Sequence, residues 1–171
     1  VLDELRGLGI RKIIMLTGDN RGVGEAVGKD VGVDEVRAEL LPEDKVTTVR
    51  ELRETYGGVA MIGDGVNDAP ALAHASVGIA MGGAGTAVAL ETADVALMGD
   101  DLGRLPFAVG LSRQARSIIR QNLYVSLGII AFLILTTTTG IFGIGWAVLV
   151  HEASSLVVIA NALRLLTYQS K

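Results

Sequence analysis

The sequence predicts an α/β domain with a mostly parallel sheet, followed by a hairpin of two membrane-spanning helices. Short apolar runs alternate with helical segments over residues 1–100, which is the order found in layered α/β domains. Glycine-containing polar loops follow two of these runs, at the sheet edge where open α/β domains bind ligands. Charged residues are frequent up to Arg120, whereas only His151 and Glu152 can carry charge near neutral pH between Gln121 and Leu163.

Composition narrows the possible classes of protein. The 171 residues carry a net charge of -4, include no cysteine, and give a mean hydropathy of +0.47. Disulfides and thiolate metal ligands are therefore excluded, and the mild acidity gives no sign of nucleic-acid binding. The chain begins at Val1 without an initiator methionine or a signal-peptide pattern, so we expect it to be a piece of a longer protein.

The elements of residues 1–100 follow from apolar periodicity and from glycine and proline punctuation. The pattern predicts helices over residues 1–8, 22–28, from 42 onward, 70–75 and 86–92. Apolar runs predict strands over residues 12–16, 59–62, 77–81 and 95–97, with a short strand or loop at 31–36. Pro42 suits a first helical position, and Glu43 and Asp44 follow where the helix dipole favours acids. Lys45 is either a surface lysine or a point charge over an anionic centre, and His74 is interpreted as a packing or surface histidine.

The first polar loop is T-G-D-N at residues 17–20. Thr17 offers a hydroxyl, Gly18 an unobstructed backbone N–H and Asp19 a carboxylate. Groups of this kind contact phosphates and nucleotides. The alternative is structural, since Asp19 or Asn20 could simply cap the following helix.

The loop that organises the domain is M-I-G-D-G-V-N-D-A-P at residues 61–70. Asp64, Asn67 and Asp68 follow a buried strand, and the glycines let the backbone approach a ligand closely. Carboxylate and amide oxygens there suit a hard cation beside a phosphoryl group. A solvated turn has the same composition and is the alternative.

Residues 101–171 divide by charge and hydropathy. We predict a cytoplasmic linker helix over residues 101–121 and a transmembrane helix over residues 122–139. A turn at 140–145 leads to a second transmembrane helix at 146–166, and residues 167–171 form a cytoplasmic tail. Asp100 and Asp101 can cap the linker helix from about Leu102. Arginines flank the two outer ends of the hairpin, so the positive-inside rule places residues 1–121 and the C-terminus in the cytoplasm. The alternative is a very apolar soluble hairpin.

His151 and Glu152 fall near the middle of the second predicted span. Ionisable side chains are costly there and indicate a functional site by default. Ser155 lies on the same helix face, and imidazole, carboxylate and hydroxyl together suit a divalent transition metal. The alternative is that His151 and Glu152 only pair with each other or with a neighbouring helix.

Three motifs together resemble the C-terminal part of the P-type ATPase family. T-G-D-N at 17–20, L-P-E-D-K at 41–45 and G-D-G-V-N-D-A-P-A-L at 63–72 have the order and rough spacing of that family's phosphorylation domain. The resemblance implies a haloacid-dehalogenase-like, Rossmann-like α/β fold for residues 1–100, which act on ATP with Mg²⁺. Soluble phosphatases share the G-D-G-x-N-D pattern, and the membrane hairpin separates this chain from them.

The resemblance also implies roles for the residues of both loops. Mg²⁺ is assigned to Asp64 and Asp68, and Lys45 stabilises charge on the phosphoryl oxygens. The contacts to phosphate and ATP are assigned to Thr17, Gly18, Asp19 and Asn67. The family's phosphorylated aspartate, in an Asp-Lys-Thr-Gly-Thr motif, has no counterpart in this chain. We therefore expect the chain alone to be inactive and to work as part of a full-length pump.

The end of the chain resembles the heavy-metal-transporting members of the family. H-E-A-S-S at 151–155 resembles the H-E-G-x-T signature of the cobalt group, with Ala153 and Ser155 in place of the usual glycine and threonine. The resemblance implies an exporter of cobalt or a similar divalent transition metal held by His151, Glu152 and Ser155. Its expected partners are the lipid bilayer of the plasma membrane and the remaining domains and helices of the same pump. Alternatives are a zinc/cadmium or copper pump, a haloacid-dehalogenase-like phosphatase, and an inactive truncated fragment.

Overall fold

The computed structural model describes residues 1–64, 67–81, 91–99 and 101–168. Several sequence-based expectations lie outside these residues: Gly65 and Val66 of the second loop, the glycine run at 82–85, most of the helix at 86–92, the cap at Asp100, and residues 169–171 of the tail. The chain divides into two compact units, Val1–Arg104 and Leu105–Lys171, which we call unit 1 and unit 2.

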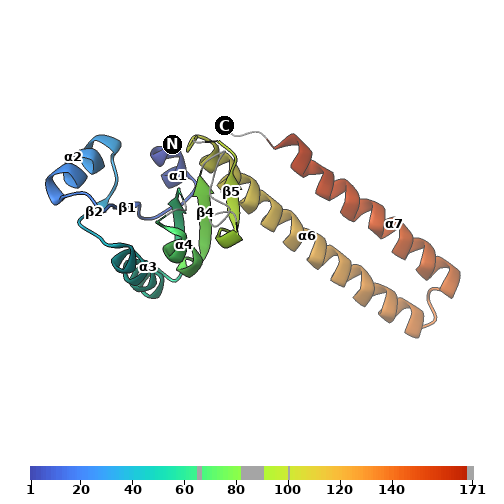
Figure 1. Cartoon of the computed structure of the whole chain (residues 1–171). Coiled ribbons are helices and arrows are strands. Elements are labelled where there is room, and N and C mark those ends of the chain that lie inside the picture. The colour runs from blue at the N-terminus through green and yellow to red at the C-terminus, as the bar shows by residue number, and fades with distance from the viewer. Residues whose placement is uncertain (65–66, 82–90, 100, 169–171) are drawn as a thin grey trace. The chain divides into compact units, whose positions relative to one another are not determined.

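Unit 1 alternates helices and strands along the chain (Figure 1). Its helices are α1 (Leu2–Gly7), α2 (Arg21–Val31), α3 (Pro42–Tyr56) and α4 (Ala69–His74). Its strands are β1 (Ile14–Leu16), β2 (Glu35–Arg37), β3 (Ala60–Gly63), β4 (Val77–Met81) and β5 (Val95–Leu97). The segment predicted as a short strand or loop at 31–36 contains the end of α2 at Val31, a turn, and the start of β2 at Glu35. Gly32 ends that helix in the left-handed conformation, with φ of 84°.

The strands of the described residues form two parallel sheets. β1 pairs with β2, with Met15 opposite Val36, and the second sheet has the order β3-β4-β5. Parallel neighbours need a crossover connection, which α2 supplies between β1 and β2 and α4 supplies between β3 and β4. The predicted α/β fold with parallel pairing is therefore confirmed, and the loops after β1 and β3 both lie at carboxyl ends of strands.

The core of unit 1 lies where α3 and α4 cover β3. Val49 of α3 and Leu72 of α4 are 1% and 0% exposed, and they cluster with Met61 of β3 and Ala71. Leu16 at the end of β1 packs against the same cluster. Burial of one such aliphatic side chain contributes about 1.5–3 kcal/mol to folding. This cluster fixes the distance between the N-terminal turn of α3 and the loop that follows β3.

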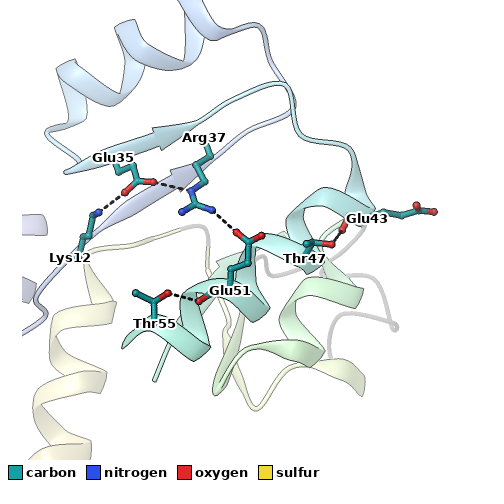
Figure 2. A network of polar contacts seen from close by, with 7 residues as sticks. All are labelled: Lys12, Glu35, Arg37, Glu43, Thr47, Glu51 and Thr55. Atoms are coloured by element: carbon teal, nitrogen blue, oxygen red, sulfur yellow. Dashed lines mark hydrogen bonds and ion pairs between the residues drawn. The ribbon is translucent and has the colours of Figure 1, made fainter. Parts of the chain in front are cut away.

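A chain of charged side chains joins the segment before β1 to β2 and α3 on the surface of unit 1 (Figure 2). The Lys12 ammonium contacts Glu35, whose other oxygen accepts a bond of 2.9 Å from Arg37, and Arg37 reaches Glu51 at 3.3 Å. The hydrogen bonds from Lys12 and then Arg37 hold the pKa of the Glu35 carboxyl below its ordinary value. These contacts attach α3 to the first sheet.

Unit 2 is a pair of long helices. α6 (Arg104–Thr138) is one continuous helix, so the predicted linker helix and the predicted first span are not separate elements. It is followed by α7 (Ile144–Leu163) and a short 3₁₀ helix, η1 (Arg164–Thr167). In the turn before α6, the Asp101 carboxylate accepts a bond of 2.8 Å from the Gly103 N–H, so Asp101 acts in the turn that precedes Arg104. Both long helices have the length and composition of candidate membrane spans.

Polar contacts hold the two long helices in register. The Asn161 amide of α7 donates to Asn122 Oδ1 at 2.8 Å and to Gln121 Oε1 at 3.2 Å on α6. Asn122 in turn donates to the Val158 carbonyl at 3.4 Å. Because amides in an apolar span need partners, these bonds fix residue 161 at the level of residues 121 and 122.

Candidate functional site

The loop after β1 forms a closed polar turn. Thr17 is buried, and its hydroxyl donates to Asp19 Oδ2 at 2.9 Å while accepting from the Asp19 N–H at 3.1 Å. Asn20, and not Asp19, caps α2, because its Oδ1 accepts from the Val23 N–H at 3.0 Å. The capping alternative therefore applies to Asn20 alone, and Asp19 is directed toward Thr17.

This turn is attached to the segment that leads into α3. The Glu39 N–H donates to the Asp19 carbonyl at 2.8 Å, and the Leu40 N–H donates to the Thr17 carbonyl at 3.1 Å. Gly18 allows the close approach, since a Cβ at that position would lie 3.3 Å from the Leu40 carbonyl oxygen. These bonds attach the loop at residues 17–20 to the segment directly before α3, the helix whose first turn carries Lys45.

Lys45 and Asp68 are joined by the ion pair that links α3 to the second loop. Lys45 Nζ lies 2.7 Å from Asp68 Oδ1, and each side chain is only 16% exposed. Lys45 is therefore not a free surface lysine, and its proposed action on phosphoryl oxygens stays a prediction. Because loss of either partner would leave the other charge shielded from water and unpaired, this pair restrains both side chains.

Gly63 makes room for that pair. A Cβ at position 63 would lie 2.7 Å from Asp68 Oδ2 and 2.8 Å from Asp68 Cβ. Asp68 precedes α4 at its N-cap position, yet within the described chain its carboxylate makes no capping bond to that helix. The carboxylate therefore points to Lys45, and the glycine at the end of β3 is required by packing against it.

The second loop presents oxygen ligands suited to magnesium. Asp64 directly follows β3 and is exposed, as is Asn67. Two carboxylates and a carboxamide match the hard oxygen donors that Mg²⁺ prefers, and Mg²⁺ usually keeps several waters and binds substrate phosphates as well. Asp64 and Asp68, with Asn67 beside them, fit that ion. Within the described ranges no three His, Cys, Asp or Glu side chains cluster as a complete metal site.

His74 has partners that the sequence did not reveal. Its Nδ1 lies 2.7 Å from the Pro70 carbonyl oxygen, and its Nε2 lies 2.6 Å from a guanidinium nitrogen of Arg50 on α3. Arg53 also donates to the His74 carbonyl at 3.3 Å. α3 is thus attached to α4 at both ends, through Lys45 and Asp68 at one end and through these contacts at the other. The contacts agree with the interpretation of His74 as a packing histidine and identify its partners.

The predicted membrane residues lie on one helix of unit 2. His151, Glu152 and Ser155 are all exposed on α7. Ser154 donates to the His151 carbonyl at 2.6 Å, so its hydroxyl is engaged with the helix backbone. Their role as ligands of a transported ion stays a prediction, since one helix supplies only part of a coordination shell.

Comparison with known proteins gives a family match for most of unit 1 and similar proteins for nearly the whole chain. Residues 1–76 match the family described as haloacid dehalogenase-like hydrolase. The chain is 53% identical over 166 residues to a probable cadmium-transporting ATPase of Alkalihalophilus pseudofirmus, which covers 97% of this chain and 23% of that protein. It is 50% identical over 169 residues to a manganese-exporting P-type ATPase of Mycobacterium tuberculosis, which covers 99% of this chain and 24% of that protein. The chain resembles heavy-metal P-type ATPases.

A solved structure agrees with this resemblance across both units. The crystal structure of a zinc-transporting PIB-type ATPase in the E2.Pi state aligns with a TM-score of 0.88 and 46% identity, over 96% of this chain and 26% of that one. The chain thus has a haloacid-dehalogenase-like α/β unit followed by two candidate transmembrane helices. It spans about a quarter of the length of the heavy-metal P-type ATPases that it matches.

Proposed function

We propose that the chain is part of an ATP-driven exporter of a divalent heavy-metal cation. The observation that carries the proposal is the shielded Lys45–Asp68 pair, beside the Thr17–Asp19 turn, in a chain that goes on into two candidate membrane spans. A soluble phosphatase would account for the α/β unit and would leave the long apolar helices unexplained.

The residues of unit 1 act by positioning and by electrostatics, which is most of what phosphoryl transfer asks of a protein. Lys45, oriented by Asp68, places a positive charge where phosphoryl oxygens gain negative charge. Thr17 and the Gly18 N–H supply neutral donors, and the Asp19 carboxylate orients the Thr17 hydroxyl. Asp64 and Asp68 would hold Mg²⁺, which when bound neutralises charge on the phosphoryl oxygens.

The nucleophile is expected from a strand that this chain does not contain. In the described residues β1 pairs on one side only, with β2, and β3 pairs on one side only, with β4. Unsatisfied strand edges invite a further strand. We propose that a strand carrying the phosphorylated aspartate pairs with β1 and β3, between the turn at Thr17 and the loop at Asp64. The chain alone would then form no phosphoenzyme.

The cargo is a divalent transition metal held with help from His151, Glu152 and Ser155. The H-E-A-S-S segment suggests cobalt, whereas similar proteins are named for cadmium, manganese and zinc. Zinc or cadmium therefore fits the comparisons better than cobalt. Imidazole, carboxylate and hydroxyl ligands are compatible with each of these ions. The exporter would lie in the plasma membrane, with residues 1–121 and the C-terminus in the cytoplasm.

The test is metal-stimulated ATPase activity of the full-length pump across Zn²⁺, Cd²⁺, Mn²⁺, Co²⁺, Ni²⁺ and Cu⁺. Lys45→Ala and Asp68→Asn should lower kcat about 100-fold or more with every ion, since both act on the phosphoryl group. Glu152→Gln and His151→Ala should abolish stimulation by the transported ion. They should leave phosphorylation by inorganic phosphate intact in a buffer that contains Mg²⁺ and no transition metal. Gly145→Ala, on the same helix and with open space around the added methyl, is the matched control.

Each result has a separate meaning. Stimulation that survives Glu152→Gln and His151→Ala would refute the membrane ion site and leave the pump assignment standing. Hydrolysis of small phosphate esters without stimulation by any of the ions would refute the pump in favour of a phosphatase.

A further inference from the structure

We propose that the arginines at the membrane border of unit 2 form a binding surface for anionic phospholipid headgroups. The surface consists of Arg113, Arg116 and Arg120 of α6, and Arg164 after α7 adds a fourth positive charge at a similar height on the other helix. The proposal rests on the proposed function only in requiring that α6 and α7 span a membrane.

The three arginines of α6 lie on one face of that helix. At about 100° per residue, positions 113, 116 and 120 fall within an arc of about 60°. All three side chains are exposed. Asn122, which bonds to α7, points about 150° away from the middle of that arc. The arginine face is therefore turned away from the partner helix of unit 2.

No acid balances these charges nearby in the sequence or in unit 2. After Asp101 the only acidic residue in the chain is Glu152. Among the described residues of unit 2, none forms an ion pair with Arg113, Arg116 or Arg120, whereas Arg104 approaches Asp101 at 3.8 Å. Within the described part of unit 2, these positive charges are therefore left for an anionic group from outside the unit.

Height along α6 decides which arginines meet headgroups. The apolar run begins near Asn122, and at about 1.5 Å per residue Arg120, Arg116 and Arg113 lie about 3, 9 and 13 Å above it. A headgroup layer is about 5–8 Å thick, and arginine side chains reach several ångströms along the helix toward it. Arg120 and Arg116 thus lie in or at the layer, and Arg113 lies within one Debye length of it.

Arg164 joins the same layer because of the amide contacts between the helices. Asn161 is level with Gln121 and Asn122, and Arg164 is three residues further toward the cytoplasm. Its guanidinium donates to Asn161 Oδ1 at 2.9 Å, which restrains it near the height of Arg120. Arg104, about 27 Å above Asn122, is about two Debye lengths beyond the headgroups and should not contribute.

Phospholipid phosphates match this layer better than a free anion does, because they are confined to one plane. An anionic leaflet attracts juxtamembrane basic side chains with a strength that corresponds to roughly fivefold in affinity per arginine. The structure therefore gives phosphatidylglycerol and similar anionic lipids preference over zwitterionic phosphatidylcholine at this surface.

The experiment measures lipid association of the full-length pump directly. Spin-labelled phosphatidylglycerol and phosphatidylcholine are compared for the fraction that is motionally restricted by the purified pump in phosphatidylcholine vesicles. The wild-type pump should prefer phosphatidylglycerol, and the preference should fall between 0.1 M and 0.5 M salt. R113Q/R116Q/R120Q should reduce the preference about fivefold or more. R21Q/K29Q/R104Q, which removes the same charge from elsewhere, should leave it unchanged.

Two further variants guard against trivial results. R113K/R116K/R120K keeps the charge and should keep the lipid preference, because a headgroup layer accepts either cation. Should the triple glutamine variant not fold, Arg120→Gln alone should lower the preference and Arg104→Gln should not.

The proposal is overturned if the triple glutamine variant retains the full preference. It is also overturned if the lysine variant loses the preference as fully as the glutamine variant, since the arginines would then bind acidic groups on other helices of the pump. The readout needs no transport. A pump without metal-stimulated activity that still prefers phosphatidylglycerol refutes the proposed function alone, and an active pump without lipid preference refutes this inference alone.

Discussion

Replacing Gly63 by alanine should displace the carboxylate that orients Lys45. An added Cβ would lie 2.8 Å from Asp68 Cβ, whereas carbon atoms pack favourably at about 3.5–4.0 Å. Asp68 must therefore retreat by about 0.7 Å or more. The 2.7 Å contact between Lys45 Nζ and Asp68 Oδ1 then lengthens beyond the usual hydrogen-bond range of about 3.2 Å.

The size of the effect follows from that displacement. A misplacement of about 1 Å in a catalytic group costs on the order of 100-fold in rate, so G63A should lower kcat about 10- to 100-fold. That loss corresponds to about 1.4–2.7 kcal/mol in the activation free energy. The assay is metal-stimulated ATPase activity of the full-length pump at saturating ATP, with limited proteolysis to show that the variant is folded.

The matched control is G58A, in the turn before the same strand. A Cβ at Gly58 meets no atom within 4 Å, and its backbone does not need a positive φ. G58A should therefore keep wild-type kcat. If G63A also stays within about twofold of wild type while folded, the reasoning that Gly63 positions Asp68 for catalysis is refuted.

Three other predictions concern the packing and charges of unit 1. G28A should destabilise the pump by about 1–3 kcal/mol, because the new Cβ would lie 2.2 Å from Val36 Cγ2, and V36A in the same chain should restore much of the loss on thermal inactivation. Hydrogen bonds from the Ile13 backbone N–H and the Arg6 guanidinium lower the pKa of the Asp34 carboxyl in the folded protein. The ionised carboxylate therefore stabilises the fold fully at a pH above its unfolded-state pKa of about 3.9, and this stabilisation is lost as the pH falls through the lower folded-state pKa. The difference in urea midpoint between wild type and D34N should accordingly shrink on acidification from pH 7 to pH 3, and a constant difference would contradict the assignment. H74A should lower kcat a few-fold, because it removes the contact between α4 and Arg50. H74Q should lower kcat less, because glutamine keeps a hydrogen-bond acceptor. Equal kcat of H74A and wild type would show that the contact is dispensable.

The parts of the fold that depend on local pattern could be predicted from the sequence. The apolar runs at 12–16 and 77–81 contain β1 and β4, since a buried parallel strand bounded by turn residues has a strong local signal. The start of α3 at Pro42 was equally clear, because proline fits only the first turn of a helix. The change from charged to apolar residues near Gln121 predicts where the membrane begins, and the backbone of α6 continues through that point.

The candidate site was predictable as a set of residues but not as a set of contacts. The two polar loops indicated Thr17 and Asp68 as candidate residues, and the start of α3 indicated Lys45. That Lys45 meets Asp68, or that Arg50 meets His74, depends on how α3 and α4 pack, which no local pattern specifies. The amides at 122 and 161 carried a usable signal, because polar residues inside apolar spans require partners.

The unbroken backbone of α6 has a mechanical consequence. Its 35 residues make a rod about 52 Å long, and its interior contains no proline beyond the first turn. A tilt of only about 5° about one end of such a rod moves the other end by about 4.5 Å, nearly the 5.4 Å pitch of one turn. A rotation about its axis would likewise reach the far end without being absorbed by a hinge. A small displacement of residues near Arg104 would thus be transmitted along α6 through the whole thickness of a bilayer.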